Sequence, residues 1–176
     1  MNVFEAIAER RCYRGIFKDV SIPRDVLVQI IEAGIKAPSA CNQQTPSFVV
    51  VDDCATLKRI AEVIPTPACK TAKAMIVCVS DSRSVYKGLS FYKEDCAAAV
   101  ENMLLALTAL GYSSVWIDGA LRFDQKAEKI AKVLKIPDTK HVQVVLPIGV
   151  PLAQEPRTTR LPFTQRASFN TWSNQT

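Results

Sequence analysis

Three arginines occur within five residues, at Arg10, Arg11 and Arg14, where the first helical pattern of the chain ends. Guanidinium groups this close repel one another, and they are tolerated best where a forked anion such as a phosphate lies between them. A phosphate-bearing ligand is therefore the first hypothesis. A solvated basic surface patch is the alternative, because runs of charge are usually solvated faces.

The spacing of the glycines limits how a phosphate could be held. The six glycines, at positions 15, 34, 88, 111, 119 and 149, form neither G-x-G-x-x-G nor a Walker A loop. We therefore expect arginine side chains, and not a glycine-lined helix start, to bind the anion. Arg157 and Arg160 near the C-terminus are further candidates for the same site.

Classical acid–base and metal chemistry has few candidates in this chain. His141 is the single histidine, and no G-x-S-x-G elbow is present. The six cysteines form no C-x-x-C pair, so the sequence predicts no zinc site and no metal, and the cysteines are expected mostly to fill the core. The side chains alone thus indicate chemistry that a cofactor supplies.

Composition predicts one globular domain without a nucleic-acid or membrane partner. The chain has 176 residues, of which 48% are hydrophobic, enough to bury a sizeable core. Its net charge of +5 is spread among acidic residues instead of forming a basic stripe. No apolar run approaches the roughly 20 residues that span a bilayer, and no signal-peptide pattern begins the chain, so a cytoplasmic location is expected.

Hydrophobic periodicity predicts helices and strands in alternation. Apolar stripes at helical spacing and capping residues predict helices over 3–11, 23–37, 54–64, 91–110 and 124–135. Apolar runs predict strands over 47–51, 74–79, 113–117 and 142–150, the last interrupted by Pro147. Residues 37–46 are expected to form a loop, and the whole pattern favours an α/β sandwich.

Four motifs in order together resemble one known family. They are R-R-x-x-R from Arg10; A-P-S-A-x-N-x-Q from Ala37; Asp95 with A-A-A-x-x-N-M-L-L-A, followed by L-G-Y-S-S-V-W-I-D-G; and G-V-P followed by R-L-P. In this order and spacing, which cover nearly the whole chain, they resemble the FMN-dependent nitroreductases.

The resemblance implies the architecture. Members of that family are homodimers of an α+β sandwich, with a central mixed, mostly antiparallel sheet flanked by helices and one FMN in each of two clefts at the subunit interface. Residues 1–176 would form a single domain, in which 152–176 are an extended segment that packs on the partner subunit.

The resemblance also implies which residues bind FMN. Arg10 and Arg160 would hold the phosphate with Arg11 and Cys12, and Arg14 would reach the ribityl chain and the N1/O2 edge of the ring. There a fixed cation favours the reduced flavin. The other subunit would line the ring with Pro38, Ser39, Ala40 and Asn42, with Gln44 nearby, and the backbone of Asp118 and Gly119 would face N5. Only core packing is expected of the Trp116 and Ile117 side chains.

Three departures from the family pattern concern the pocket. Cys12 stands where a serine is usual, and a thiol is a poorer hydrogen-bond donor to phosphate. Thr45-Pro46 replaces the frequent Pro-Trp and removes an aromatic wall. The chain also lacks the long insertions that form substrate lids in larger members.

The implied activity is that of an NAD(P)H oxidoreductase with a ping-pong mechanism. NADH or NADPH would deliver hydride to flavin N5, and a small acceptor such as a nitroaromatic or quinone would then take electrons from the same face. Two alternatives keep the fold: specialised chemistry, either reductive dehalogenation or flavin fragmentation, or non-enzymatic FMN binding.

Cys41 lies between Ala40 and Asn42 in the proposed flavin loop. A thiol near several arginines can have a lowered pKa and be prone to oxidation. The alternative is a small side chain that fills a tight turn.

Overall fold

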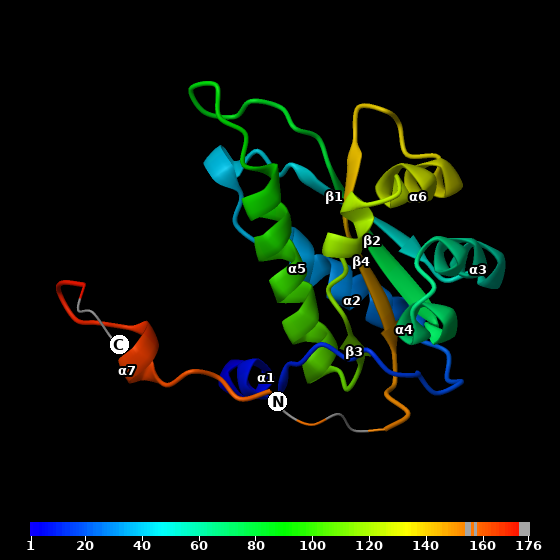
Figure 1. Cartoon of the computed structure of the whole chain (residues 1–176), viewed down its shortest axis with the longest axis horizontal. Helices are drawn as coiled ribbons and strands as arrows, with labels where there is room; N and C mark the ends of the chain where they lie inside the picture. The colour runs from blue at the N-terminus through cyan, green and yellow to red at the C-terminus, as the bar shows by residue number, and fades with distance from the viewer. Residues whose placement is uncertain (154–155, 157, 173–176) are drawn as a thin grey trace.

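The computed structural model describes residues 1–153, 156 and 158–172. These residues form a four-stranded sheet in the order β1-β2-β4-β3, shown in Figure 1. The strands are β1 (Pro46–Val51), β2 (Ala74–Ser80), β3 (Ser113–Ser114) and β4 (His141–Gly149). All three strand pairs are antiparallel, and a single parallel bridge joins Cys12 to Ser114 beside β3.

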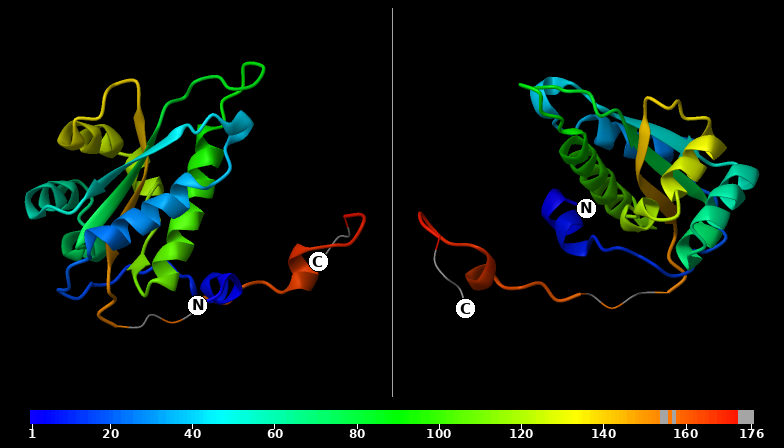
Figure 2. Two further views of the ribbon diagram at one scale, coloured as in Figure 1. Left: turned by 180° about the vertical axis from the view of Figure 1, so that it is seen from behind. Right: turned by 45° about the horizontal axis from the view of Figure 1, so that its top comes forward.

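Helices cover both faces of the sheet, which confirms the predicted sandwich (Figures 1 and 2). One face packs against α2 (Arg24–Ile35) and α5 (Tyr92–Ala109), and the other against α3 (Cys54–Val63), α4 (Pro67–Thr71) and α6 (Lys126–Leu134). α1 (Val3–Glu9) lies against α5, and α7 (Phe163–Arg166) lies in the extended C-terminal segment. Two short 3-10 helices, η1 (Ala40–Asn42) and η2 (Gly119–Arg122), complete the described elements.

Strand alternation divides the core into two clusters. Along β2, Ile76 and Cys78 face α2 and α5, whereas Met75 and Val77 face α3 and α4. A bulge in β4 opposite Cys78 and Val79 leaves Gln143 as the extra residue. The bulge reverses the alternation of β4, so Val142 and Val144 face opposite sides of the sheet although they are two residues apart. Each side chain thereby packs into an apolar cluster.

Local signals at helix ends explain the boundaries that were predicted correctly. The side chain of Asn2 accepts a hydrogen bond from the backbone N–H of Glu5, and the Glu5 carboxylate accepts one from Asn2. Asp53 caps α3 through the N–H of Thr56. After α5, Gly111 adopts a φ of +82°, and the N–H of Tyr112 closes the helix end on the carbonyl of Leu107 at 2.9 Å.

Several predicted boundaries were wrong: the helices expected over 23–37 and 124–135 are Arg24–Ile35 and Lys126–Leu134, and three further differences have a clear cause. The first helix ends at Glu9 and not at residue 11, because Arg10 leaves helical conformation with a ψ of 129°. Pro67 begins α4 instead of ending the preceding helix, since proline is well suited to a first helical turn. The strand expected over 113–117 contains only Ser113–Ser114.

Pro147 explains the short β3. It pairs with Met75, so β4 continues past it on the β2 side. On the other side, the backbone groups of Val145 bond with those of Ile117. The nitrogen of residue 147 faces the same side as that of Val145, but proline has no N–H to donate. Pairing with β4 therefore breaks between Ser114 and Ile117, and this frees the chain to turn into η2.

No helix among the described residues is both long enough and apolar enough to cross a membrane.

Candidate cofactor site

The arginine segment is held at the edge of the sheet by backbone pairing. The N–H of Tyr13 donates to the carbonyl of Ser114 at 2.8 Å, and the Tyr13 ring is buried in the core with 4% exposure. Its hydroxyl donates to the carbonyl of Ile16 at 2.6 Å. The backbone on both sides of Tyr13 is thereby fixed, so the position of Arg14 is set by the core and not by a mobile loop.

Carboxylates within the chain offset part of the arginine charge. Nε of Arg10 lies 2.8 Å from a carboxylate oxygen of Glu101 on α5, and Arg11 lies 4.0 Å from Glu9. The repulsion that first suggested a bound phosphate is thus reduced without one. The motif keeps Arg10 and Arg11 as candidates for phosphate binding, but repulsion between the arginines does not by itself require a bound phosphate.

Arg14 lines a cavity of about 350 Å³ together with the segment that follows β3. Asp118 and Gly119, which were predicted to face the flavin, line the same cavity. Its wall is largely apolar and includes Ile64 and Pro67. The structure therefore brings three of the predicted residues into one pocket that has a single arginine among its lining residues and an apolar side.

Gly119 leaves one side of this cavity open. A Cβ built at Gly119 would meet no heavy atom within 4 Å, and the residue is exposed. Its backbone can therefore be approached closely by a ligand. Asp118 beside it is paired with Arg122 at 3.2 Å, which offsets the negative charge of that carboxylate.

The loop predicted to line the other side of the flavin is ordered around one buried carboxylate. Asp95 is 3% exposed; one of its oxygens accepts from the N–H of Ala40 at 2.9 Å, and the other accepts from the hydroxyl of Thr45 at 2.5 Å. Within the loop, the N–H of Gln44 donates to the hydroxyl of Ser39 at 2.9 Å. Asp95 thus ties both ends of the turn to the start of α5.

The turn itself has unusual backbone geometry. Cys41, Asn42 and Gln44 have φ values of 50°, 53° and 50°, in the left-handed region. Asparagine tolerates this region better than most residues. Pro38, Ser39 and Gln44 line a separate cavity of about 140 Å³ with Asp95, and Cys41, Asn42 and Gln44 are exposed.

Most of the predicted residues therefore fall into two groups in the single chain. Arg14, Asp118 and Gly119 share one cavity; Pro38, Ser39 and Gln44 share another, with Ala40 and Asn42 in the adjoining turn. Arg160 lies exposed in the C-terminal segment and lines neither cavity. The Cys12 side chain packs partly against the core, and Arg157 lies outside the described residues.

Sequence reasoning missed several contributors. The Trp116 side chain was expected only to pack in the core; it is half-buried, packs against the α2 and α5 cluster and also borders a cavity beside α5. Thr66, Pro67 and Ala68 join the Arg14 cavity from the start of α4, which was not predicted. Thr45 was noted only because it stands near the position of a frequent aromatic residue, but its hydroxyl donates a hydrogen bond to Asp95. A proline next to a capping threonine was the available signal for α4.

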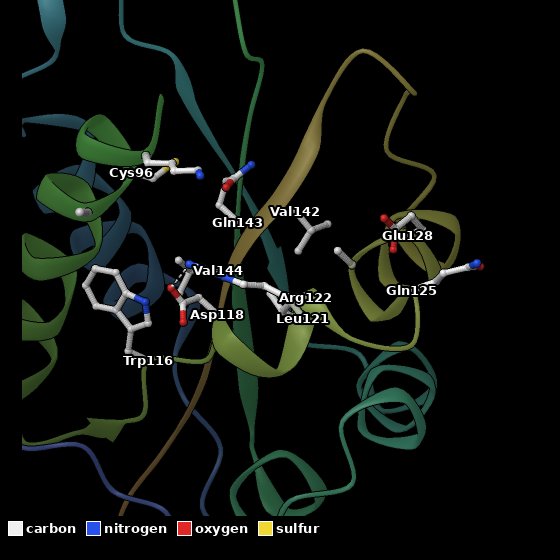
Figure 3. Close-up of a pocket in the computed structure, with 13 residues that line it drawn as sticks. Cys96, Trp116, Asp118, Leu121, Arg122, Gln125, Glu128, Val142, Gln143 and Val144 are labelled. Carbon is white, nitrogen blue, oxygen red and sulfur yellow. Dashed lines mark hydrogen bonds and ion pairs between the residues drawn. The ribbon is translucent and has the colours of Figure 1, made fainter. Parts of the chain in front are cut away.

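A further cavity of about 430 Å³ lies on the other side of the Trp116–Asp118 segment (Figure 3). It is bounded by α5, η2, α6 and the start of β4. Polar and charged side chains enter it from several elements, among them Lys93, Arg122, Glu128 and Gln143. Gln143 is the bulged residue of β4, so the bulge contributes directly to this cavity.

Comparison with known proteins agrees with the fold and the motifs. The profile of the Nitroreductase family matches residues 7–68 and 70–150. A protein of Methanothermobacter thermautotrophicus, whose name assigns it provisionally as an NADH dehydrogenase/NAD(P)H nitroreductase, is 34% identical over 173 residues, which cover 98% of this chain and 88% of the relative.

Two solved structures are similar over most of their length. A nitroreductase family protein from Clostridium novyi NT is 31% identical with a TM-score of 0.76, and the match covers 86% of each chain. An FMN-dependent nitroreductase from Clostridium difficile R20291 is 25% identical with a TM-score of 0.83, covering 96% of this chain and 99% of that one.

This α+β sandwich, with its arginine-bearing cavity at the sheet edge, has the fold of a class of cofactor-dependent oxidoreductases. The chain is a member of the nitroreductase family. The family and fold expected from the sequence are confirmed.

Proposed function

We propose that this protein passes electrons from NADH or NADPH to a small acceptor, such as a nitroaromatic or a quinone, by a ping-pong mechanism at FMN bound between two subunits. The family membership and the relatives support its class, an FMN-dependent NAD(P)H oxidoreductase. The acceptor, the mechanism and the roles of individual residues extend this class and belong to the proposal. The juxtaposition of Arg14, Pro67 and Gly119 in one cavity carries the proposal.

The chemistry of the Arg14 cavity fits a flavin ring. An isoalloxazine needs apolar walls and a cation near N1 and O2, and the cavity offers Ile64, Pro67 and Arg14. The exposed backbone of Gly119 offers an N–H without a side chain in the way. When bound, FMN supplies hydride acceptance at N5 and the return of electrons to the acceptor.

The side chains around the cavity bind and orient, and none is required to move a proton. Arg14 would hold its guanidinium near the pyrimidine edge of the ring and stabilise negative charge there. Ile64 and Pro67 supply apolar walls and exclude water. The carboxylate of Asp118 is paired with Arg122, so it does not oppose Arg14 with a full free charge.

The loop of residues 38–44 supplies the second wall from the other subunit. Its Ser39, Ala40, Asn42 and Gln44 present hydroxyl, amide and backbone groups at the surface. The loop bonds to the first turn of α5, whereas the segment that carries Arg14 pairs with β3 through Cys12 and Tyr13, beyond the other end of that helix (Figure 1). This separation within one chain favours a site made by two copies, in which each copy gives its cavity to one flavin and its loop to the other.

Exposed apolar side chains support a homodimer. In α1, Val3, Phe4 and Ile7 are 58%, 79% and 55% exposed, whereas Ala6 is buried. In the C-terminal segment, Phe169 and Trp172 are 81% and 85% exposed. Large apolar side chains that gather on exposed elements mark interaction surfaces. We assign both elements to the subunit interface, with Arg10, Arg11 and Arg160 at the flavin phosphate.

The visible absorption spectrum of the purified protein tests this function. The expected result is a yellow protein whose flavin band is bleached by anaerobic addition of NADH or NADPH and restored by a nitroaromatic or a quinone. A colourless protein that fails to take up added FMN would contradict the proposal. A flavin that neither nicotinamide cofactor reduces, and that passes no electrons to a nitroaromatic after dithionite has been added, would favour non-enzymatic FMN binding instead.

A further inference from the structure

Two buried cysteines face each other between the sheet and α5. The sulfur atoms of Cys78 on β2 and Cys96 on α5 are 3.3 Å apart, and the residues are 0% and 2% exposed. The Cys78 thiol donates to the Cys96 sulfur. A disulfide bond is about 2.05 Å long, so bond formation needs the sulfurs to approach by roughly 1.2 Å.

The two thiols differ in their access to small molecules. Cys96 lines the 430 Å³ cavity beyond the Trp116–Asp118 segment, whereas Cys78 is not among its lining residues (Figure 3). A small molecule that enters this cavity therefore meets Cys96 first. Cys78 lies behind it, in position to react with whatever forms on Cys96.

The surroundings also favour Cys96 as the nucleophile. The hydrogen bond from Cys78 lowers the pKa of Cys96, although burial opposes this, and the same bond and burial both raise the pKa of Cys78. The hydroxyl of Ser80 lowers the pKa of Cys96 too, although the nearby Asp95 opposes this. That hydroxyl is buried and has no other hydrogen-bond partner among the described residues, so it is available to donate to a Cys96 thiolate.

We propose that Cys96 and Cys78 form a peroxide-sensitive redox site, with Cys96 as the attacking cysteine and Cys78 as the resolving one. The Cys96 thiolate attacks a hydroperoxide: an S–O bond forms and the O–O bond breaks, the remaining oxygen takes up a proton and leaves as an alcohol or as water, and Cys96 becomes a sulfenic acid. Cys78 then attacks that sulfur, the S–S bond forms, and water leaves. Two thiols are oxidised by two electrons and one peroxide is reduced, and a thiol reductant reverses the change.

The disulfide would link β2 to the first turn of α5, one residue from Asp95. Asp95 holds the loop of residues 38–45, so oxidation would act on the elements that support this loop. The redox site does not depend on bound FMN, so a negative result for the cysteine pair would not count against the proposed oxidoreductase activity. A redox sensor usually has a low-pKa cysteine that the oxidant can reach, beside a resolving cysteine; here the oxidant reaches the buried Cys96 through the cavity.

The test is peroxide titration of the full-length protein carrying Cys41→Ser and Cys54→Ser, which removes the two exposed thiols. We expect the intact mass to fall by two hydrogen masses and a peptide pair joined through Cys78 and Cys96 to appear, with dithiothreitol restoring both. Cys69 serves as the internal control, because burial raises the pKa of its thiol and it should stay reduced.

Single variants separate the two roles. Cys78→Ser should leave a sulfenic acid on Cys96 that dimedone traps, whereas Cys96→Ser should leave Cys78 unmodified at the same peroxide dose. Circular dichroism verifies that both variants fold. Absence of the linked peptide at doses that oxidise Cys41 and Cys54 in the unmodified protein would overturn the proposal, and so would equal dimedone labelling of Cys78 in Cys96→Ser.

Discussion

The Arg14 cavity and the loop of residues 38–44 are held in place in different ways. The cavity is set by the buried ring of Tyr13 and by backbone pairing to Ser114. The loop depends on a single buried carboxylate, Asp95, and contains residues with left-handed φ values. The comparison teaches that the backbone of the cavity should keep its conformation when single side chains are changed, whereas the loop should lose its conformation when Asp95 is lost.

Gly119→Val should have the largest effect on flavin binding. A side chain there meets nothing within the chain, so it should not destabilise the fold, but it would occupy the open side of the cavity. Overpacking by a few methyl groups costs up to about 3 kcal/mol, which is about a hundredfold in affinity. FMN titration by fluorescence quenching measures the loss, and thermal unfolding without FMN supplies the control. Unchanged affinity would remove Gly119 from the site.

Asp95→Ala should damage both the loop and the fold. The Thr45 hydroxyl and the Ala40 N–H would lose their buried partner, and each unsatisfied group costs roughly 1–3 kcal/mol. We expect a lower free energy of unfolding in urea and weaker FMN binding. Asp95→Asn, which keeps one acceptor oxygen, is the matched control and should lose less of both. Full FMN affinity in a folded Asp95→Ala protein would break the contrast between loop and cavity.

Arg14→Ala should slow flavin reduction more than Arg11→Ala does. A charged hydrogen bond is worth about 1.5–3 kcal/mol, so loss of the Arg14 cation predicts about a 10- to 100-fold lower reduction rate in anaerobic stopped flow. Arg11→Ala should instead weaken FMN binding, with a reduction rate close to that of the unmodified protein at saturating FMN. Equal effects on reduction would refute this division of roles.

Cys41→Ser should have the smallest effect. Cys41 is exposed in the turn, and serine has nearly the same size. If the thiol only fills the turn, FMN affinity and the loss of activity after peroxide treatment should match those of the unmodified protein. Protection of activity by this substitution would show instead that Cys41 is the oxidation-sensitive group of the loop.

Local signals made most of the fold predictable. The capping residues Asn2 and Asp53 and the cap glycine Gly111 mark helix ends through contacts a few residues away, and the structure shows each of them. The errors have long-range causes. Pro147 shortens a strand that lies over 30 residues earlier in the chain, and only the sheet register reveals this.

The candidate site was predictable as a set of residues but not as an arrangement. Motif spacing selected Arg14, Asp118 and Gly119, which the fold brings together. It could not show that Glu101 pairs with Arg10, or that Asp95 bonds to Thr45 across 50 positions. Nor could periodicity distinguish a core tryptophan from one that lines a cavity, because Trp116 does both in part.

A mixed dimer tests the central claim that each flavin lies between the cavity of one copy and the loop of the other. Gly119→Val and Asp95→Ala chains with different affinity tags are co-expressed, the mixed species is purified over both tags, and bound FMN is counted. One site then combines both defects, while the other combines an intact cavity with an intact loop. We predict one FMN per mixed dimer under conditions in which neither homodimeric variant binds any. A mixed dimer without FMN would contradict the account, because it would place cavity and loop on the same chain.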